Sequence, residues 1–262
     1  MNLFLRHMIV GAVLGMASFG VCSAENSTVT PKADNTAPKT ENLTAQTLIA
    51  KMTEIYKNCT SYLDSGVVNT SFFMKKGDYV DKVPFTTAFK RSPRQFRFWF
   101  SSQAPQKNAE IKHHIILVKN KEVIVWQNAE TGIEKESSLS DAIADAVAVS
   151  GGAAQTIPVL IGAHSFGGKS IADLNSPKRI EDAFQDGVMC YRIQEQRTLA
   201  DAGPVTIWIN KKTFLIHRID SSQKFKDFRT ETTKIYKPQI NIPIDESKFA
   251  LNAPKQVKKA AK

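Results

Sequence analysis

One serine of this chain stands in a motif that could support nucleophilic chemistry. Ser165 lies in Val159-Leu160-Ile161-Gly162-Ala163-His164-Ser165-Phe166-Gly167-Gly168, which is similar to the sharp turn that exposes a serine nucleophile between a strand and a helix. His217 follows downstream, which is the order that a serine hydrolase requires. The aspartates between them are Asp173, Asp182, Asp186 and Asp201. Ala163 replaces the usual glycine, and Pro177 would cut the following helix short. A serine esterase or hydrolase using Ser165 and His217 is therefore the alternative function.

A second candidate site is an apolar surface formed by aromatic side chains. Residues 89–100 hold five aromatic and four basic residues in twelve positions. If residues 95–101 form a strand, Phe96, Phe98 and Phe100 point to one face. On a concave sheet this row would bind an apolar ligand, whereas on a packed sheet it would be ordinary core. Further candidate lining residues are Trp126 and Trp208, with Ile143 and Val147 from a covering helix.

The N-terminus is typical of a secretory signal peptide. Residues 1–24 contain Arg6 and His7, then the apolar stretch Met8–Val21, then small residues that end at Ala24. The stretch is too short to span a bilayer. An acylated Cys22 is the alternative, but Val21 stands where a small residue is normally required. We therefore expect a periplasmic protein that is exported by a cleavable signal peptide.

Export bears on the cysteines. Removal of the signal peptide leaves Cys59 and Cys190, an even pair in an oxidising compartment. A disulfide between them would join the end of the first helix to a late strand, and two separate buried thiols are the alternative. No histidines accompany them in a zinc-binding pattern. His113 and His114 are neighbours in a predicted strand and therefore face opposite sides. The sequence predicts neither a metal site nor a cofactor.

The charge of the chain is basic, with a formal net charge of +10. Part of the excess lies in a C-terminal tail, residues 255–262. No zinc finger, helix-turn-helix or aromatic RNA-binding motif accompanies it, so nucleic acid is not an expected partner. A basic surface fits an anionic membrane, although a simply solvated surface explains it equally well.

Hydrophobic patterns predict the elements that position these residues. An amphipathic helix is expected over Leu43–Asn58, with Leu48, Ile49, Met52, Ile55 and Tyr56 on one face. Strands are expected at 66–73, 83–90, 95–101, 111–118, 122–127, 179–184, 188–194, 205–210, 213–219 and 225–236. Between the two series, a helix at 142–149 precedes an apolar stretch of short helical or loop pieces at 153–168.

Short turns between successive strands predict an antiparallel sheet. Asp186-Gly187 is a strong tight-turn signal, and Lys119-Asn120 separates two strands at hairpin distance. The fold class is therefore mainly β (α+β): a large curved antiparallel sheet, or open barrel, covered by a few helices. Residues 25–41 are almost without apolar side chains and predict a disordered linker, so that 42–254 form one domain.

The order of these elements is similar to that of LolA, the periplasmic lipoprotein carrier family. The most specific match is the closing segment, Ile244-Asp245-Glu246-Ser247-Lys248-Phe249-Ala250-Leu251-Asn252-Ala253-Pro254. Phe89-Lys90-Arg91 with Pro93 resembles the family's Lys-Arg-Pro strand, and Val123-Ile124-Val125-Trp126 resembles its apolar-Trp strand. Ser92 between Arg91 and Pro93, and the two remaining cysteines, depart from the family pattern.

The resemblance implies an unclosed β-barrel with helices over its concave side, which binds acyl chains. It also implies that Arg91 hydrogen-bonds the helical lid. We therefore expect a non-catalytic, periplasmic carrier or binding protein for lipids or acylated lipoproteins, with an inner- or outer-membrane receptor as a further partner. The expected ligand-binding residues are Arg91, Phe96, Phe98, Phe100, Trp126, Ile143, Val147 and Trp208. Relatives of this fold bind other lipids or sense envelope stress, so the fold alone does not fix the function.

Overall fold

The first helix packs its apolar face against the sheet, as its sequence pattern predicts. The computed structural model describes residues 43–103, 110–128, 133–162, 170–196 and 202–251. Helix α1 (Ala45–Asn58) begins at Thr44, whose hydroxyl accepts a hydrogen bond from the backbone N–H of Thr47. Leu48, Met52 and Tyr56 are fully buried, so α1 contributes one face to the main core.

Two series of antiparallel strands follow. The first comprises β1 (Ser61–Met74), β2 (Tyr79–Lys90), β3 (Gln95–Gln103), β4 (Ile111–Lys119), β5 (Glu122–Gln127) and β6 (Ile133–Glu136). The second comprises β7 (Lys178–Gln185), β8 (Val188–Glu195), β9 (Ala202–Asn210), β10 (Ile216–Lys224), β11 (Phe228–Tyr236) and β12 (Gln239–Ile240). The ten predicted strands are present, and the short strands β6 and β12 are additional.

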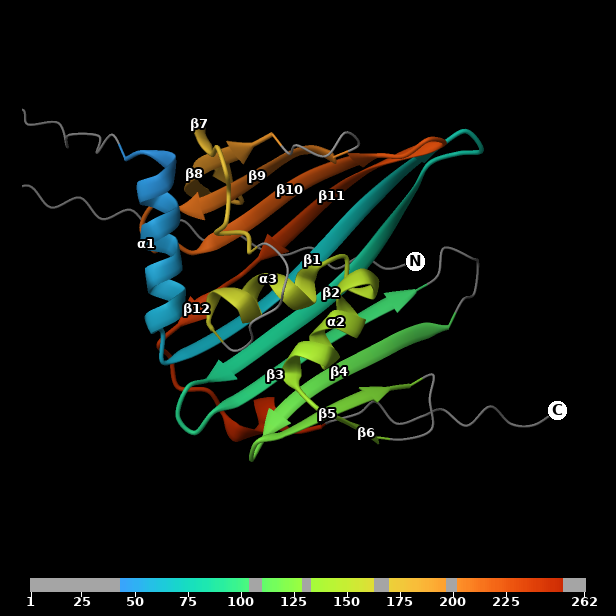
Figure 1. The fold of residues 1–262 in the computed structure, drawn as a ribbon, viewed down its shortest axis with the longest axis vertical. Helices are drawn as coiled ribbons and strands as arrows, with labels where there is room; N and C mark the ends of the chain where they lie inside the picture. The colour runs from blue at the N-terminus through green and yellow to red at the C-terminus, as the bar shows by residue number, and fades with distance from the viewer. Residues whose placement is uncertain (1–42, 104–109, 129–132, 163–169, 197–201, 252–262) are drawn as a thin grey trace, which may run out of the picture. The chain divides into compact units, whose positions relative to one another are not determined.

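The two series join where β1 pairs with β11. The strand order is β6-β5-β4-β3-β2-β1-β11-β10-β9-β8-β7, and β12 pairs with the beginning of β1. β1 and β11 are antiparallel, with Gly66 opposite Tyr236 and Met74 opposite Phe228. β6 and β7 stand at the two ends of this order and do not pair with each other, so the sheet is unclosed. The predicted fold class is confirmed (Figure 1).

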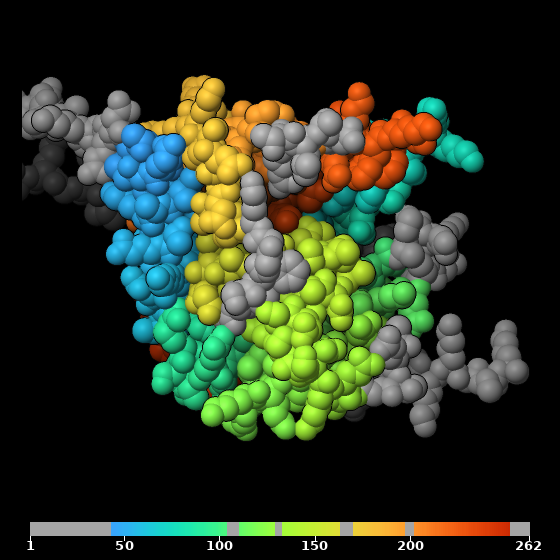
Figure 2. All heavy atoms as spheres, viewed as in Figure 1, coloured from blue at the N-terminus to red at the C-terminus, as the bar shows by residue number. Residues whose placement is uncertain are grey.

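Two helices lie over one face of the sheet, which we call the inner face (Figures 1 and 2). Helix α2 (Leu139–Val149) begins at Ser138, whose side chain accepts from the N–H of Asp141. Gly151 and Gly152 separate it from α3 (Ala153–Leu160), and both have positive φ, which favours glycine. Buried side chains of both helices join α1 and the inner rows of the strands in one core.

A second, smaller core lies on the opposite, outer face. The 3₁₀ helix η1 (Glu246–Phe249) places the fully buried ring of Phe249 against a cluster that includes Ala88, Ile115 and Leu117. Lys90 Nζ lies 2.6 Å from a Glu246 carboxylate oxygen, and Arg97 Nε donates to the carbonyl of Ala250 at 3.1 Å. The closing segment of the chain is therefore a strap across β2, β3 and β4.

Most turns follow their sequence signals. Asn120 and Lys121 both have positive φ in the β4–β5 hairpin, as do Asp186 and Gly187 between β7 and β8. The β9–β10 connection is longer than predicted, because β10 begins at Ile216 and not at Thr213. Asn210 explains the difference, since its side-chain oxygen accepts hydrogen bonds from the N–H groups of Lys212 and Thr213. Within the described ranges, no helix has the length and apolar character needed to cross a membrane.

Candidate functional site

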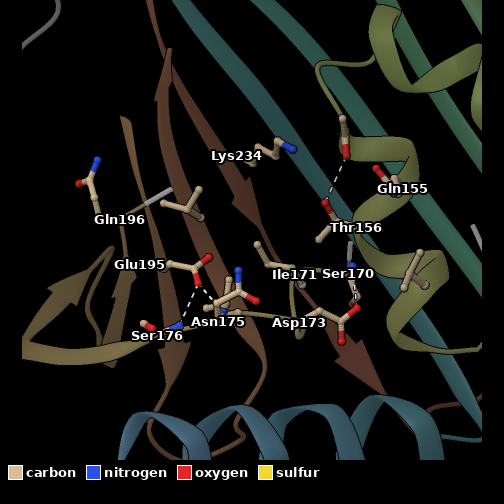
Figure 3. A pocket seen from close by; sticks show the side chains of 14 residues that line it. Gln155, Thr156, Ser170, Ile171, Asp173, Asn175, Ser176, Glu195, Gln196 and Lys234 are labelled. Carbon is tan, nitrogen blue, oxygen red and sulfur yellow. Dashed lines mark hydrogen bonds between the residues drawn. The ribbon is translucent and has the colours of Figure 1, made fainter. Parts of the chain in front are cut away.

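A pocket of about 550 Å³ opens between α3 and the inner face of the sheet (Figure 3). Its walls come from α3, from residues 170–176, and from the strands β8, β9 and β11. Its apolar lining consists of Val159, Ile171, Leu174 and Val205. Val205 belongs to the main core and Ile171 and Leu174 pack against it, so the floor of the pocket continues into the apolar interior.

Charged side chains gather around the same pocket. Lys234 comes from β11, Glu195 from β8 and Asp173 from the 170–176 segment. Glu195 Oε1 accepts hydrogen bonds from the backbone N–H groups of Asn175 and Ser176, and Asp173 Oδ2 accepts from the N–H of Ser170 at 3.0 Å. These contacts hold the 170–176 segment against the end of β8. The pocket is therefore amphipathic, with an apolar floor and a polar margin.

Gly152 leaves room for the lysine of this margin. A Cβ atom at Gly152 would lie 2.7 Å from Lys234 Nζ, and the glycine has a φ of +78°. The positive φ therefore favours glycine here, whereas the flexible end of Lys234 could move away from a Cβ atom. The loop between α2 and α3 can thus lie directly over β11 with Lys234 beneath it.

The structure places the aromatic row within the main core. Phe96, Phe98 and Phe100 are at most 1% exposed, and the rings of Phe98 and Phe100 are 5.6 Å apart. Ile143 is fully buried in the same cluster, and Val147 packs against it. These five predicted site residues are thus brought together, but they fill the interior with their own side chains. The pocket lies beside them, along the second series of strands.

The two predicted tryptophans lie apart from the aromatic row, on the outer face of the sheet. Trp126 belongs to the outer cluster beneath the C-terminal strap. Trp208 alternates with Ile207 and Ile209, which are in the main core, so its ring projects outward. There it lies between the guanidinium groups of Arg192 and Arg218, and its Nε1 donates to Asp220 at 2.8 Å.

Arg91 connects three elements at the beginning of the β2–β3 turn. Its Nε donates to the carbonyl of Cys59 at 2.8 Å, and its terminal nitrogen donates to the carbonyls of Lys57 at 2.7 Å and Ile161 at 3.2 Å. Cys59 and Lys57 belong to the end of α1, and Ile161 ends α3. The hydrogen bond to the covering helix that the family resemblance implies is therefore present, although Arg91 as a whole is exposed.

A buried carboxyl group lies on the inner face of β1. Asp64 is 4% exposed; its Oδ2 accepts from the hydroxyl of Tyr62 at 2.7 Å and its Oδ1 accepts from the N–H of Thr87 at 2.8 Å. Burial raises the pKa of Asp64 to about 6, against the opposing effect of these hydrogen bonds. Burial also raises the pKa of the nearby Tyr62 and Tyr236 hydroxyls. The interior beneath the helices is thus not wholly apolar.

The predicted disulfide is absent from the structure, and this prediction was wrong. Cys59 and Cys190 are separate buried thiols. Cys59 packs in the main core, where its Sγ donates to the carbonyl of Tyr56 at 3.1 Å. Cys190 lies on β8 between Met189 and the core residue Tyr191, so its side chain points to the outer face. The two sulfur atoms are therefore on opposite sides of the sheet. Burial raises the pKa of Cys190 to about 11.

The described residues that precede Ser165 do not have the geometry of a nucleophile elbow, which the alternative hydrolase function requires. Ser165 lies outside the described residues, and so does Asp201. The residues before it form helix α3 and not the strand that an elbow requires, and every described strand pair is antiparallel. His217 Nε2 lies 3.3 Å from the side-chain nitrogen of Asn210, and burial lowers the pKa of His217.

The adjacent histidines also take structural positions. The His113 ring stacks on Trp99, and the His114 ring stacks on Phe100 at 4.3 Å between centroids. Because Phe100 is in the inner core and Trp99 packs against the outer cluster, the two imidazoles face opposite sides as predicted. Among the described residues, no group of three His, Cys, Asp or Glu side chains could hold a metal ion.

The pocket residues Lys234 and Glu195 and the buried Asp64 were not predicted from the sequence. The sequence pattern could have identified Asp64 as a buried polar residue, because it interrupts the inward-facing row formed by Tyr62, Gly66 and Val68 on β1. No pattern in the sequence identifies Lys234, since it lies among threonines on a strand that has polar residues on both faces.

The unclosed antiparallel sheet with helices over its inner face is the arrangement that the resemblance to LolA implies. Among solved structures, the chain is similar to LprF from Mycobacterium bovis, with 12% identity over 76% of this chain and 94% of that one, at a TM-score of 0.43. It is also similar to a LolA superfamily protein from Nitrosomonas europaea, with 12% identity over 79% and 98%, at 0.28. The Pseudomonas aeruginosa MucA/MucB complex is a third, with 7% identity over 78% and 60%, at 0.40. No family model and no curated protein sequence matches the chain.

Proposed function

We propose that this protein is an exported carrier or binding protein that holds a lipid, or the acyl chain of a lipoprotein, beneath α3. The observation that supports this most strongly is the amphipathic pocket between α3 and the inner face of the sheet. Its volume of about 550 Å³ falls within the range of small-molecule sites, roughly 300–1,000 Å³. An apolar floor with a charged margin suits an amphiphile, whose chain lies inside and whose polar end stays at the margin.

The energetics favour the apolar floor as the source of affinity. Burying an acyl chain contributes about 0.8 kcal/mol per CH₂ group, so a long chain contributes on the order of 10 kcal/mol before ordering costs. The buried aromatic row and Ile143 belong to the same core as Val205, which lines the pocket. A chain longer than the pocket would have to displace these side chains, with α3 moving away from the sheet. Arg91 is placed to oppose that movement, because it holds the end of α3.

A pair of valine substitutions tests the site. Val159 lines the pocket on α3, whereas Val149 ends α2 with 48% of its surface exposed and lies outside the pocket. Val159→Asp should abolish displacement of a fluorescent fatty acid, and Val149→Asp should leave it unchanged. Lipid mass spectrometry of the protein purified under native conditions would identify the cargo. A wild-type protein that binds no lipid or lipopeptide at micromolar concentration would contradict the proposal.

The proposed carrier function is non-catalytic, and a variant of Ser165 tests whether the protein is a carrier or an esterase. Ser165→Ala should leave folding and fatty-acid displacement almost unchanged. Hydrolysis of a short-chain nitrophenyl ester that the wild type performs and this variant does not would favour the esterase instead.

Periplasmic location and delivery to an inner- or outer-membrane receptor are part of the same proposal. Residues 1–24 support export by their composition. N-terminal sequencing of the protein recovered from the periplasmic fraction should begin at Glu25. If the protein is found in the cytoplasm with Met1 still present, that result would contradict the proposed export.

A further inference from the structure

Two hairpin ends lie side by side at the margin of the sheet farthest from α1 (Figure 1). One is the end of β1 and β2, residues 74–79, and the other is the end of β10 and β11, residues 224–229. Register brings them together, since Met74 pairs with Phe228. Lys75 Nζ also lies 3.7 Å from a carboxylate oxygen of Asp227. We call these two segments the hairpin tips.

The hairpin tips carry aromatic rings that belong to neither core. Phe225 stacks on Phe228 at 4.3 Å between centroids, Phe228 lies 6.5 Å from Phe72, and Phe72 stacks on Tyr79 at 4.4 Å. None of these four rings is in the inner or outer cluster of the described core. Phe225 is 37% exposed and Met74 is 39% exposed. A row of aromatic side chains therefore runs across two strand ends with one margin open to solvent.

The same tips are strongly basic. Residues 74–79 and 224–229 contain five basic and two acidic side chains, a net charge of +3 on twelve residues. Both acids are engaged, because Asp78 accepts from the N–H of Met74 and Asp227 lies near Lys75. Lys76, Lys224 and Lys226 are exposed, and they form no ion pair with a described residue.

The tips also project beyond the covering helices. The α2–α3 connection lies close to Val68 of β1, because a Cβ on Gly151 would lie 2.8 Å from Val68 Cγ1. Met74 lies six positions beyond Val68 along β1, which is about 20 Å of extended chain. The hairpin tips therefore lie beyond the α2–α3 connection (Figure 1).

We propose that the hairpin tips dock on an anionic phospholipid surface, with Phe225 and Met74 in the headgroup region and the lysines beside lipid phosphates. Aromatic side chains favour the membrane–water interface, and basic residues near an anionic surface attract it. The hairpin tips combine a row of stacked rings with exposed lysines at both ends. They therefore supply both the interfacial aromatic side chains and the electrostatic attraction in one place. The inference does not depend on the pocket, which lies at a different part of the inner face.

Flotation with vesicles tests the docking. The purified protein should float with vesicles of equal parts phosphatidylcholine and phosphatidylglycerol, should float much less with phosphatidylcholine alone, and should be released by high salt. Replacing Lys224 and Lys226 by Glu should weaken partitioning about thirtyfold or more. The matched control, Lys112→Glu with Lys178→Glu, changes two exposed lysines elsewhere and should retain most of the binding.

Substitutions of exposed apolar residues separate the insertion of side chains into the headgroup region from the electrostatic attraction to the vesicle surface. Phe225→Ser with Met74→Ser should weaken partitioning about tenfold, whereas Phe184→Ser, at a residue 67% exposed on β7, should not. All substituted side chains are exposed, so each variant should melt like the wild type. Absence of vesicle binding by the wild type, or equal binding by the tip variants, would overturn the proposal. Loss of self-association in Phe225→Ser without any vesicle binding would also overturn it, and would assign the tips to a dimer interface.

Discussion

At the scale of single residues, Asp64 makes the stability of this protein depend on pH in an unusual direction. Its pKa is raised to about 6 from 3.8 by burial, so between these values the folded state binds more protons than the unfolded state. The contribution of Asp64 to stability is therefore fully present at low pH and is lost as pH rises through the folded-state pKa. A shift of this size corresponds to about 3 kcal/mol.

The prediction for Asp64 is a difference between two unfolding curves. Asp64→Asn keeps an acceptor for Thr87 but cannot ionise. From about pH 3 to about pH 7, the urea unfolding free energy of the wild type should fall by about 3 kcal/mol relative to that of the variant. Comparison with the variant removes the opposite contribution of exposed acids such as Asp141 and Glu246, whose pKa values are lowered by hydrogen bonds. Parallel curves would mean that Asp64 is ionised in the folded protein without penalty.

The cysteines give a second prediction at this scale. In a protein carrying Cys22→Ser, thiol titration in denaturant should count two free thiols, and without denaturant almost none, because Cys59 and Cys190 are both buried. Their burial also raises both thiol pKa values, which lowers reactivity further. An intramolecular disulfide in the purified protein, seen as a mass loss of two hydrogens, would contradict the separated positions.

At the scale of elements, Arg91 links the ends of α1 and α3. Arg91→Leu removes three hydrogen bonds to backbone carbonyls and should cost about 1–2 kcal/mol, a fall of about 2–8 °C in melting temperature. Release of a bound fluorescent fatty acid should accelerate more than this stability change implies, because the bond to Ile161 restrains α3. Arg91→Lys keeps the charge without the planar fork and should be intermediate. Unchanged release kinetics would return Arg91 to a purely structural role.

A substitution in the C-terminal strap should change stability without changing ligand affinity. Phe249 is fully buried on the outer face, so Phe249→Ala should destabilise the protein by about 3–5 kcal/mol. The fatty-acid dissociation constant should remain unchanged at temperatures where the variant is folded, because the pocket lies on the inner face. A parallel loss of affinity would show that the two faces are coupled through β2 and β3.

Strand periodicity explains which site residues could be predicted. Phe96, Phe98 and Phe100 share a face because alternation fixes it, and the same rule applied to Ile207, Trp208 and Ile209 would have placed Trp208 outside. Trp126 was not predictable in this way, because β5 is apolar on both faces. That pattern arises from the strap, which is more than a hundred residues away in the sequence. The pocket was unpredictable for the same reason, since segments distant in sequence form its walls.

At the scale of the whole molecule, the two faces of the sheet have different roles. The inner face carries the helices and the pocket, and the outer face of the first strand series carries the strap. On addition of lipid, amide hydrogen exchange should slow in α3 and in residues 170–176, while η1 should be unaffected. The ligand-free protein is the reference for both segments. Protection confined to η1 would place the ligand on the other face.

The pairing of β1 with β11 also sets an order of events while the chain is being made. β1 can pair with β2 as soon as residue 90 has emerged, but its other edge must wait for Tyr236, close to the C-terminus. Until then the backbone groups of residues 66–74 remain an open template for another chain. A half-made molecule is therefore prone to aggregation, and a chaperone that shields this one strand edge would protect it throughout that interval.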